Sequence, residues 1–117
     1  MNQLNPRNIN PEELNRWLIE DSIRPTLVDV REKDELAIAS FTYPVLHLPL
    51  SESLIWIESY SAKLPCEKPI VVICHSGIRS LNFGIWLLEQ DSNYEVWNLQ
   101  GGIDAWSELI DTSVPRY

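Results

Sequence analysis

The stretch IVVICHSGIRS, residues 70–80, decides how this chain is expected to fold. It begins with four apolar β-branched residues, the pattern of a parallel strand that is covered on both faces. Cys74 follows, and from Ile78 onward apolar residues recur at spacings of three and four to about Gln90. We therefore predict a central strand, a tight loop and a helix, with a thiol at the carboxyl end of the strand.

The same alternation of strand and helix continues on either side of this stretch. We expect further strands at 26–30, 43–50 and 94–99, helices at 11–20, 31–39, 51–63 and 101–110, and a tail at 111–117. Asn10, Pro11 and Glu13 carry the start signals of the first helix, and Ser51 is expected to cap the third. The pattern predicts one α/β domain over residues 1–117, doubly wound, with a mainly parallel central sheet of about five strands and helices on both faces.

Composition narrows the range of partners. The chain has 117 residues and a net charge of −8, and such an acidic surface argues against nucleic acid or an anionic membrane as a partner. No apolar run approaches the ~18 residues that a membrane-spanning helix needs, and the N-terminus shows no signal peptide. We expect a cytoplasmic monomer in which any anionic ligand is held by a local positive charge.

The inventory of thiols and imidazoles is small. Cys66 and Cys74 are the two cysteines, fewer than a secreted disulfide framework would carry, and with two histidines they make a poor metal site. We expect no metal and no cofactor. Cys66 lies between two prolines and is expected to be a surface loop residue, with a resolving-thiol role as the alternative.

The surroundings of Cys74 predict nucleophilic chemistry. In open parallel sheets the ligand lies beyond the carboxyl ends of the strands, and a helix N-terminus there favours a thiolate over a thiol. Gly77 permits a positive φ, so that successive backbone N–H groups can point inward around an anion. Arg79 adds a permanent cation and His75 a partial one. Together these features predict an activated thiolate in a small anion cradle.

Each of these residues also has a simpler interpretation. Cys74 could be a small buried hydrophobe, and His75 a spacer. Ser76 and Ser80 offer hydroxyl donors, but Ser80 is equally suited to the first turn of a helix. The prediction of a site therefore depends on their coincidence within a few residues.

Asp29 and Arg31 end the neighbouring strand, within the sequence LVDVRE. They either pair with Arg79, extend the cationic mouth of the site, or form a solvated pair of their own at a strand-to-helix turn. The sequence leaves these alternatives open.

Three segments together resemble a known family. LVDVREKDEL (27–36), CHSGIRS (74–80) and LQGGIDAW (99–106) occur in the order and spacing of a single-domain rhodanese-like protein, and the resemblance covers nearly the whole chain. It implies a doubly wound α/β fold and sulfurtransferase activity. Cys74 would then accept the sulfane sulfur of a donor such as thiosulfate and pass it, as a persulfide, to cyanide or to a thiol or protein acceptor.

The resemblance also assigns residues to the site. Cys74 is implied as the catalytic residue, and the loop that follows it would cradle the transferred sulfur through backbone N–H groups. Arg79 would bind the anionic donor and stabilise departing sulfite. Arg31 matches the arginine of the family's DVR segment, where a structural role is the alternative to substrate binding. The substrate-binding residues implied in this way are His75, Ser76, Gly77, Ile78, Arg79, Ser80 and Arg31.

One segment departs from the family pattern. Relatives usually carry a turn of the form GHIPGA between the DVRE segment and the next strand, close to the mouth of the site. Residues 37–50 read AIASFTYPVLHLPL here and contain no glycine. This difference opens the question of donor specificity.

Two other functions remain open at this point. A phosphatase or arsenate reductase would also use a cysteine and an arginine around an anion, and a non-catalytic binding or sulfur-sensing module would use the fold alone. Four residues separate Cys74 from Arg79, one fewer than in cysteine phosphatases. The shorter ring resembles the sulfurtransferase loop and suits a terminal sulfur better than a tetrahedral phosphate.

Overall fold

A computed structural model describes residues 5–117 and places five strands in one sheet, in the order β1-β5-β4-β2-β3, with every neighbouring pair parallel. The strands are β1 (Arg7–Ile9), β2 (Thr26–Asp29), β3 (Leu46–His47), β4 (Ile70–Ile73) and β5 (Val96–Leu99). The helices are α1 (Pro11–Glu20), α2 (Lys33–Ile38), α3 (Ser53–Trp56), α4 (Tyr60–Lys63), α5 (Ile78–Gln90) and α6 (Gly102–Leu109). This architecture confirms the predicted α/β fold with a parallel sheet.

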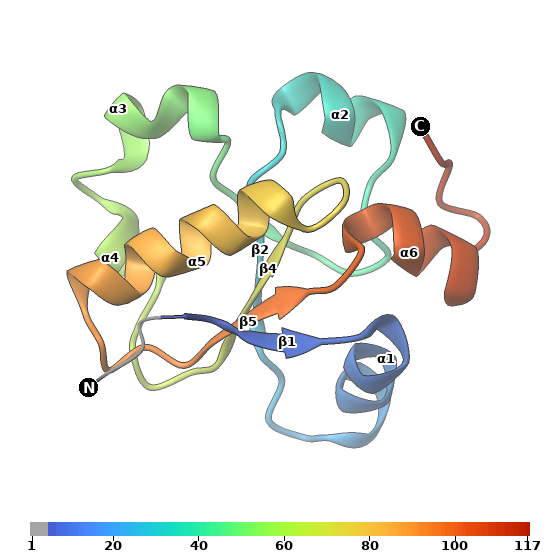
Figure 1. Cartoon of the computed structure of the whole chain (residues 1–117), viewed down its shortest axis with the longest axis horizontal. Helices are drawn as coiled ribbons and strands as arrows, with labels where there is room; N and C mark the ends of the chain where they lie inside the picture. The colour runs from blue at the N-terminus through green and yellow to red at the C-terminus, as the bar shows by residue number, and fades with distance from the viewer. Residues whose placement is uncertain (1–4) are drawn as a thin grey trace.

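Strand β4 lies at the centre of the sheet, and its side chains alternate between two hydrophobic cores. Val71 and Ile73 pack in one core with residues of α1 and α6, whereas Ile70 and Val72 pack in the other with residues of α3 and α5. Figure 1 shows these two groups of helices on either side of the strands. Because both faces of β4 are buried, its sequence reads as a continuous apolar run.

The first helix begins as its capping signals predict. The side chain of Asn10 accepts a hydrogen bond from the backbone N–H of Glu13 at 2.8 Å, and the Glu13 carboxylate accepts one in return from the N–H of Asn10 at 3.2 Å. Reciprocal caps of this kind satisfy backbone donors that the first turn of a helix leaves free.

Two expected elements are shorter than predicted. The strand expected over 43–50 pairs only at Leu46–His47, because Pro44 and Pro49 have no N–H to donate to a neighbouring strand. The helix expected over 51–63 is divided into a 3₁₀ turn at Leu50–Glu52 and the separate helices α3 and α4.

Ser51 does not cap a helix. Its hydroxyl and backbone N–H both face the carboxylate of Glu32, and it lies inside the 3₁₀ turn. The chain then turns so that Trp56 is buried and donates its indole N–H to Pro49 O at 2.8 Å. Burial of this large ring favours a bent segment over one regular helix.

Strand β1 was not predicted. It consists of three residues at the edge of the sheet, two of them exposed, and pairs with β5. So short and polar a segment carries no period-two pattern that a sequence reading can detect.

Within residues 5–117, no helix has the length and apolar character needed to cross a membrane.

The chain order of the strands reverses between β2 and β4. After β2 the chain adds β3 on one side, and it then returns to place β4 and β5 on the other, between β2 and the edge strand β1. In such sheets the crevice at this reversal, beyond the carboxyl ends of the strands, is where ligands bind. Cys74 directly follows β4 and Val30 follows β2, so the predicted site residues lie at this crevice.

Candidate active site

The thiol of Cys74 is buried, with 1% of the residue exposed, and is held by two hydrogen bonds from its own loop. The backbone N–H of Gly77 donates to Sγ at 3.0 Å, and the hydroxyl of Ser80 lies 3.2 Å from the same sulfur. Gly77 has φ of 107°, a conformation that side chains disfavour, and it is the N-cap residue directly before α5. The loop thus turns an N–H donor towards sulfur, where it stabilises negative charge.

A buried amide links the two partners of the sulfur. Asn98, on β5, accepts a hydrogen bond from the Ser80 hydroxyl at 2.5 Å and donates one from Nδ2 to Gly77 O at 3.0 Å. Because the Ser80 proton points at Asn98, the Ser80 oxygen is left to accept a hydrogen bond from the Cys74 thiol. Asn98 therefore positions both groups that touch the sulfur without touching it itself.

If Cys74 accepts a sulfane sulfur, as the family resemblance implies, the Asn98→Ala variant should be loaded about 10-fold more slowly than the wild type. Loss of the Asn98 amide leaves the buried Ser80 hydroxyl and the Gly77 carbonyl without a hydrogen-bond partner, which costs roughly 1–3 kcal/mol for each group. The measurement is the rate of sulfur loading on folded protein, and Asn93→Ala, in an exposed turn, is the control. Equal rates for all three proteins would mean that Asn98 has no positioning role.

The N-terminus of α6 holds the loop from the other side. The N–H groups of Ile103 and Asp104 donate to the carbonyl oxygens of Cys74 and His75 at 2.9 and 3.1 Å. A Cβ on Gly102, which has φ of 60°, would stand 2.4–2.5 Å from these same backbone carbonyl groups. The GGIDAW segment therefore contains glycine where two backbones meet behind the site.

Arg79 is paired rather than free. Its guanidinium makes two hydrogen bonds to the carboxylate of Glu35, on α2, at 2.6 and 2.8 Å. The side chains are 35% and 18% exposed, so the pair lies at the mouth of the site, partly shielded from water. The hydrogen bond from Arg79 is the largest cause that lowers the pKa of Glu35 to about 2, and the pKa of Arg79 is raised in turn.

Arg31 and Asp29 form a separate ion pair inside the protein. Both side chains are 0% exposed and meet at 2.8 Å, so none of the three alternatives open from the sequence applies. All five N–H donors of Arg31 are occupied, by the Asp29 carboxylate, the carbonyls of Glu35 and Ala39, and the Tyr117 hydroxyl. This placement favours the structural role for Arg31 over a substrate contact, because its donors join the end of β2 to α2 and to Tyr117.

The remaining loop residues point in different directions. The His75 ring stacks on Tyr117 with 4.2 Å between ring centroids and 13° between planes. Ser76 and Ile78 are exposed, Ile78 by 69%, and so face outwards at the rim. The structure therefore brings Cys74, Gly77 and Ser80 together around the sulfur.

Sequence reasoning missed three residues of this site. Glu35 lies within a segment that carries the family resemblance and Asn98 directly before another, yet only their partners in space reveal what they do. Tyr117, in the segment predicted as a tail, donates its hydroxyl to Glu35 at 2.8 Å and accepts from Arg31 at 2.9 Å. Figure 1 shows this end of the chain beside α2.

The second cysteine lies at the opposite end of β4. Cys66 precedes the strand, and its thiol donates to the Asp91 carboxylate at 3.2 Å. Burial is the largest cause that raises the pKa of the Cys66 thiol, with the neighbouring Asp91 acting in the same direction. Both cysteines are free, and their separation along β4 argues against a resolving role for Cys66.

The segment that replaces the family's glycine turn is anchored by aromatic contacts. Phe41 packs on Trp106 with 4.7 Å between ring centroids, and Trp106 donates its indole N–H to Thr42 at 2.8 Å. These contacts hold the segment against α6.

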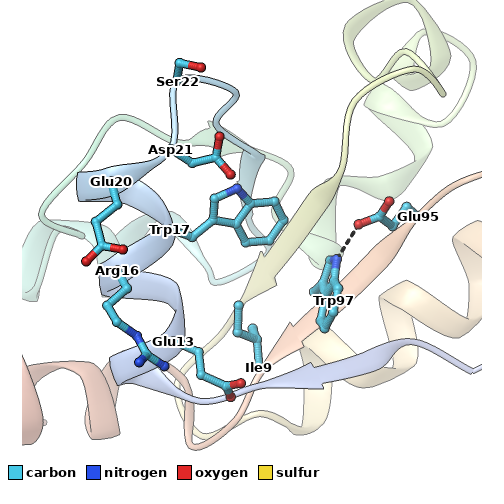
Figure 2. A pocket seen from close by; sticks show the side chains of 9 residues that line it. All are labelled: Ile9, Glu13, Arg16, Trp17, Glu20, Asp21, Ser22, Glu95 and Trp97. Carbon is cyan, nitrogen blue, oxygen red and sulfur yellow. Dashed lines mark hydrogen bonds between the residues drawn. The ribbon is translucent and has the colours of Figure 1, made fainter.

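A cavity of about 630 Å³ lies away from the cysteine loop. Figure 2 shows Trp17 of α1 and Trp97 of β5 on its walls, together with several acidic side chains. None of its lining residues belongs to the loop 74–80.

Within residues 5–117, no three His, Cys, Asp or Glu side chains gather as a metal site requires.

Comparison with known proteins identifies the family of this chain. Residues 10–109 match the family described as Rhodanese-like domain. The chain is 39% identical over 92 residues to Rhodanese-like/PpiC domain-containing protein 12 of Arabidopsis thaliana, covering 78% of this chain and 30% of the relative. It is 33% identical over 103 residues to thiosulfate sulfurtransferase GlpE of Coxiella burnetii, covering 86% and 88%.

A solved structure extends the likeness to three dimensions. The rhodanese-related protein of Thermoplasma volcanium superposes with a TM-score of 0.68 at 29% identity, covering 93% of this chain and 95% of the other. The fold, the family match over residues 10–109 and the similarity to these relatives all indicate the same family. The chain belongs to the rhodanese-like domain family.

Proposed function

We propose that this protein is a sulfurtransferase that carries a sulfane sulfur on Cys74 as a persulfide. Its partners are a small sulfur donor, for which thiosulfate is the simplest probe, and a thiol or protein acceptor. The observation that carries the proposal is the buried Cys74 sulfur, which receives the Gly77 N–H at 3.0 Å and lies 3.2 Å from Ser80. Membership of a family with relatives named thiosulfate sulfurtransferase supports the same assignment.

The proposed reaction has two displacements at sulfur. In the first, the Cys74 thiolate attacks the outer sulfur of the donor, an S–S bond forms to Cys74, and the donor's own S–S bond breaks. With thiosulfate the electron pair leaves on sulfite. In the second, an acceptor thiolate or cyanide attacks the outer sulfur of the persulfide and returns the electron pair to Cys74.

The hydrogen bonds around Cys74 suit this chemistry. Gly77 N–H is fixed by the fold and needs no reorganisation as charge develops on sulfur. Ser80 and Asn98 hold the cysteine side chain in one orientation. The compact ring between Cys74 and Arg79 favours a terminal sulfur over the larger phosphoryl group.

Turnover is the test. We expect the wild-type protein to form thiocyanate from cyanide and either thiosulfate or hydroxyethyl persulfide, for many cycles per protein molecule and faster than the protein-free mixture. Heat-denatured protein is the matched control. Rates equal to the protein-free mixture with both donors would overturn the proposal and favour a non-catalytic binding module.

A further inference from the structure

The charge of Arg79 is already neutralised in the folded protein. Its guanidinium meets both oxygens of the Glu35 carboxylate, the same two-point geometry by which an arginine would grip the sulfonate of thiosulfate. A donor that needs Arg79 must therefore displace Glu35 or accept a contact shared with it. The Glu35 carboxylate would also repel an anion approaching the mouth.

Glu35 is firmly held in this position. Besides the two bonds from Arg79, its carboxylate accepts the Tyr117 hydroxyl at 2.8 Å and the backbone N–H of Glu32 at 3.0 Å. The last of these contacts caps α2, so the position of Glu35 is built into the start of a helix. The hydrogen bond from Arg79 is the main cause that lowers the pKa of Glu35 to about 2, so the carboxylate is ionised near neutral pH.

The other arginine at this edge of the sheet does not replace the lost charge. Arg31 is fully buried against Asp29 with all its donors occupied. The chain as a whole carries −8. A dianionic donor therefore approaches an acidic protein whose two candidate cations, Arg31 and Arg79, each face a carboxylate.

We propose that Glu35 is a specificity-determining residue that masks Arg79, so that the site accepts sulfur from an alkyl persulfide in preference to thiosulfate. This inference rests on the proposed function, since it concerns the donor for the same cysteine. An alkyl persulfide has no sulfonate, and so it needs no guanidinium. Its sulfur can be met by the backbone N–H of Gly77 without a cation.

The transfer from a persulfide is balanced without an oxidant or reductant. The Cys74 thiolate attacks the outer sulfur of R–S–SH, an S–S bond forms to Cys74, and the S–S bond of the donor breaks. The electron pair leaves on R–S⁻, which carries a single charge. Thiosulfate instead releases sulfite, a dianion, and so depends more strongly on a free cation at the mouth.

The Glu35→Gln variant tests this inference. Glutamine removes the negative charge and keeps an oxygen that can cap α2. We expect kcat/KM for loading Cys74 from thiosulfate to rise about 10-fold, mainly through a lower KM, because a charge-assisted contact to Arg79 becomes available. Loading from hydroxyethyl persulfide should change less than about 3-fold, because removing a partly exposed charge at the mouth of the site has a small effect on a donor that does not contact Arg79.

Two further variants show whether a faster reaction with thiosulfate comes from the Glu35–Arg79 pair. Asp34→Asn changes the net charge equally, and Asp34 is exposed on the same helix, so this variant should load thiosulfate at the wild-type rate. The double variant Glu35→Gln, Arg79→Gln should lose the gain. An unchanged thiosulfate rate in Glu35→Gln, or an equal gain in Asp34→Asn, would overturn the inference.

The salt dependence of the wild-type protein gives a test that needs no variant. If Arg79 is masked, added salt screens repulsion between thiosulfate and an acidic protein, and loading should become faster. Loading that slows with salt would show an accessible cation and contradict the inference. Failure of the proposed function looks different, because then neither donor loads Cys74 in any of these proteins.

Discussion

Cys74→Ser is expected to reduce sulfur transfer more than about 10³-fold, because the serine hydroxyl cannot carry a sulfane sulfur. The substitution is close in size, and Gly77 N–H and the Ser80 hydroxyl can still bond to the new oxygen. The fold should therefore survive, and the loss should appear in the chemistry alone. Thiocyanate formation and the midpoint of urea unfolding, measured on the same preparation, separate these two effects.

The matched control is Cys66→Ser. Cys66 lies at the other end of β4 and bonds to Asp91, so its loss should leave thiocyanate formation near the wild-type rate. If Cys74→Ser retained activity, or Cys66→Ser lost it, the nucleophile would have been assigned to the wrong residue.

Arg31→Met is expected to destabilise the protein by about 3–5 kcal/mol, since it strands a buried carboxylate. Asp29 is fully buried and would keep only the backbone N–H of residue 31 as a partner among its present contacts. The same change removes the hydrogen bonds to the carbonyls of Glu35, within α2, and of Ala39, at the C-cap of that helix. The free energy of unfolding in urea measures the loss.

Two variants show whether the stranded charge is the cause. Asp29→Asn combined with Arg31→Met should recover part of the lost stability, because the buried charge is gone. Arg116→Met breaks the exposed pair with Asp104 and should leave the unfolding midpoint nearly unchanged. Normal stability in Arg31→Met, with a raised KM for thiosulfate, would instead make Arg31 the substrate contact that the family resemblance implies.

The centre of the fold could be predicted from sequence because its signals are local. Strand β4, the glycine turn and α5 follow one another within residues 70–90, and each has its own pattern of apolar residues, glycine and helical spacing. The helix at 11–20 carries its capping residues beside it. In these segments local preference and tertiary packing agree, and the predicted boundaries hold within a residue or two.

The remaining differences depend on contacts between distant parts of the chain. The 51–63 segment bends because Trp56 turns inward to Pro49, and β1 exists only because β5 offers a partner. A sequence reading that uses local periodicity cannot register either effect. Segments with weak patterns therefore take their structure from their neighbours in space.

The charge of the site was the least predictable property. Arg79 reads from the sequence as a free cation, but its partner Glu35 is 44 positions earlier in the chain. Asn98 is likewise 18 positions from Ser80. Spacing along the chain predicted the cysteine nucleophile and the glycine turn that follows it. The pairing of Arg79 with Glu35, and the hydrogen bonds from Asn98 to the residues around the sulfur, could be seen only in the three-dimensional arrangement.

The most direct test of the proposed chemistry is the intact mass of the protein after incubation with a sulfur donor. With concentrated thiosulfate or hydroxyethyl persulfide, we predict a gain of about 32 Da, one sulfur atom per chain, that cyanide removes. Cys74→Ser should gain nothing under the same conditions. An unchanged wild-type mass with both donors, or an equal gain in Cys74→Ser, would contradict a persulfide on Cys74.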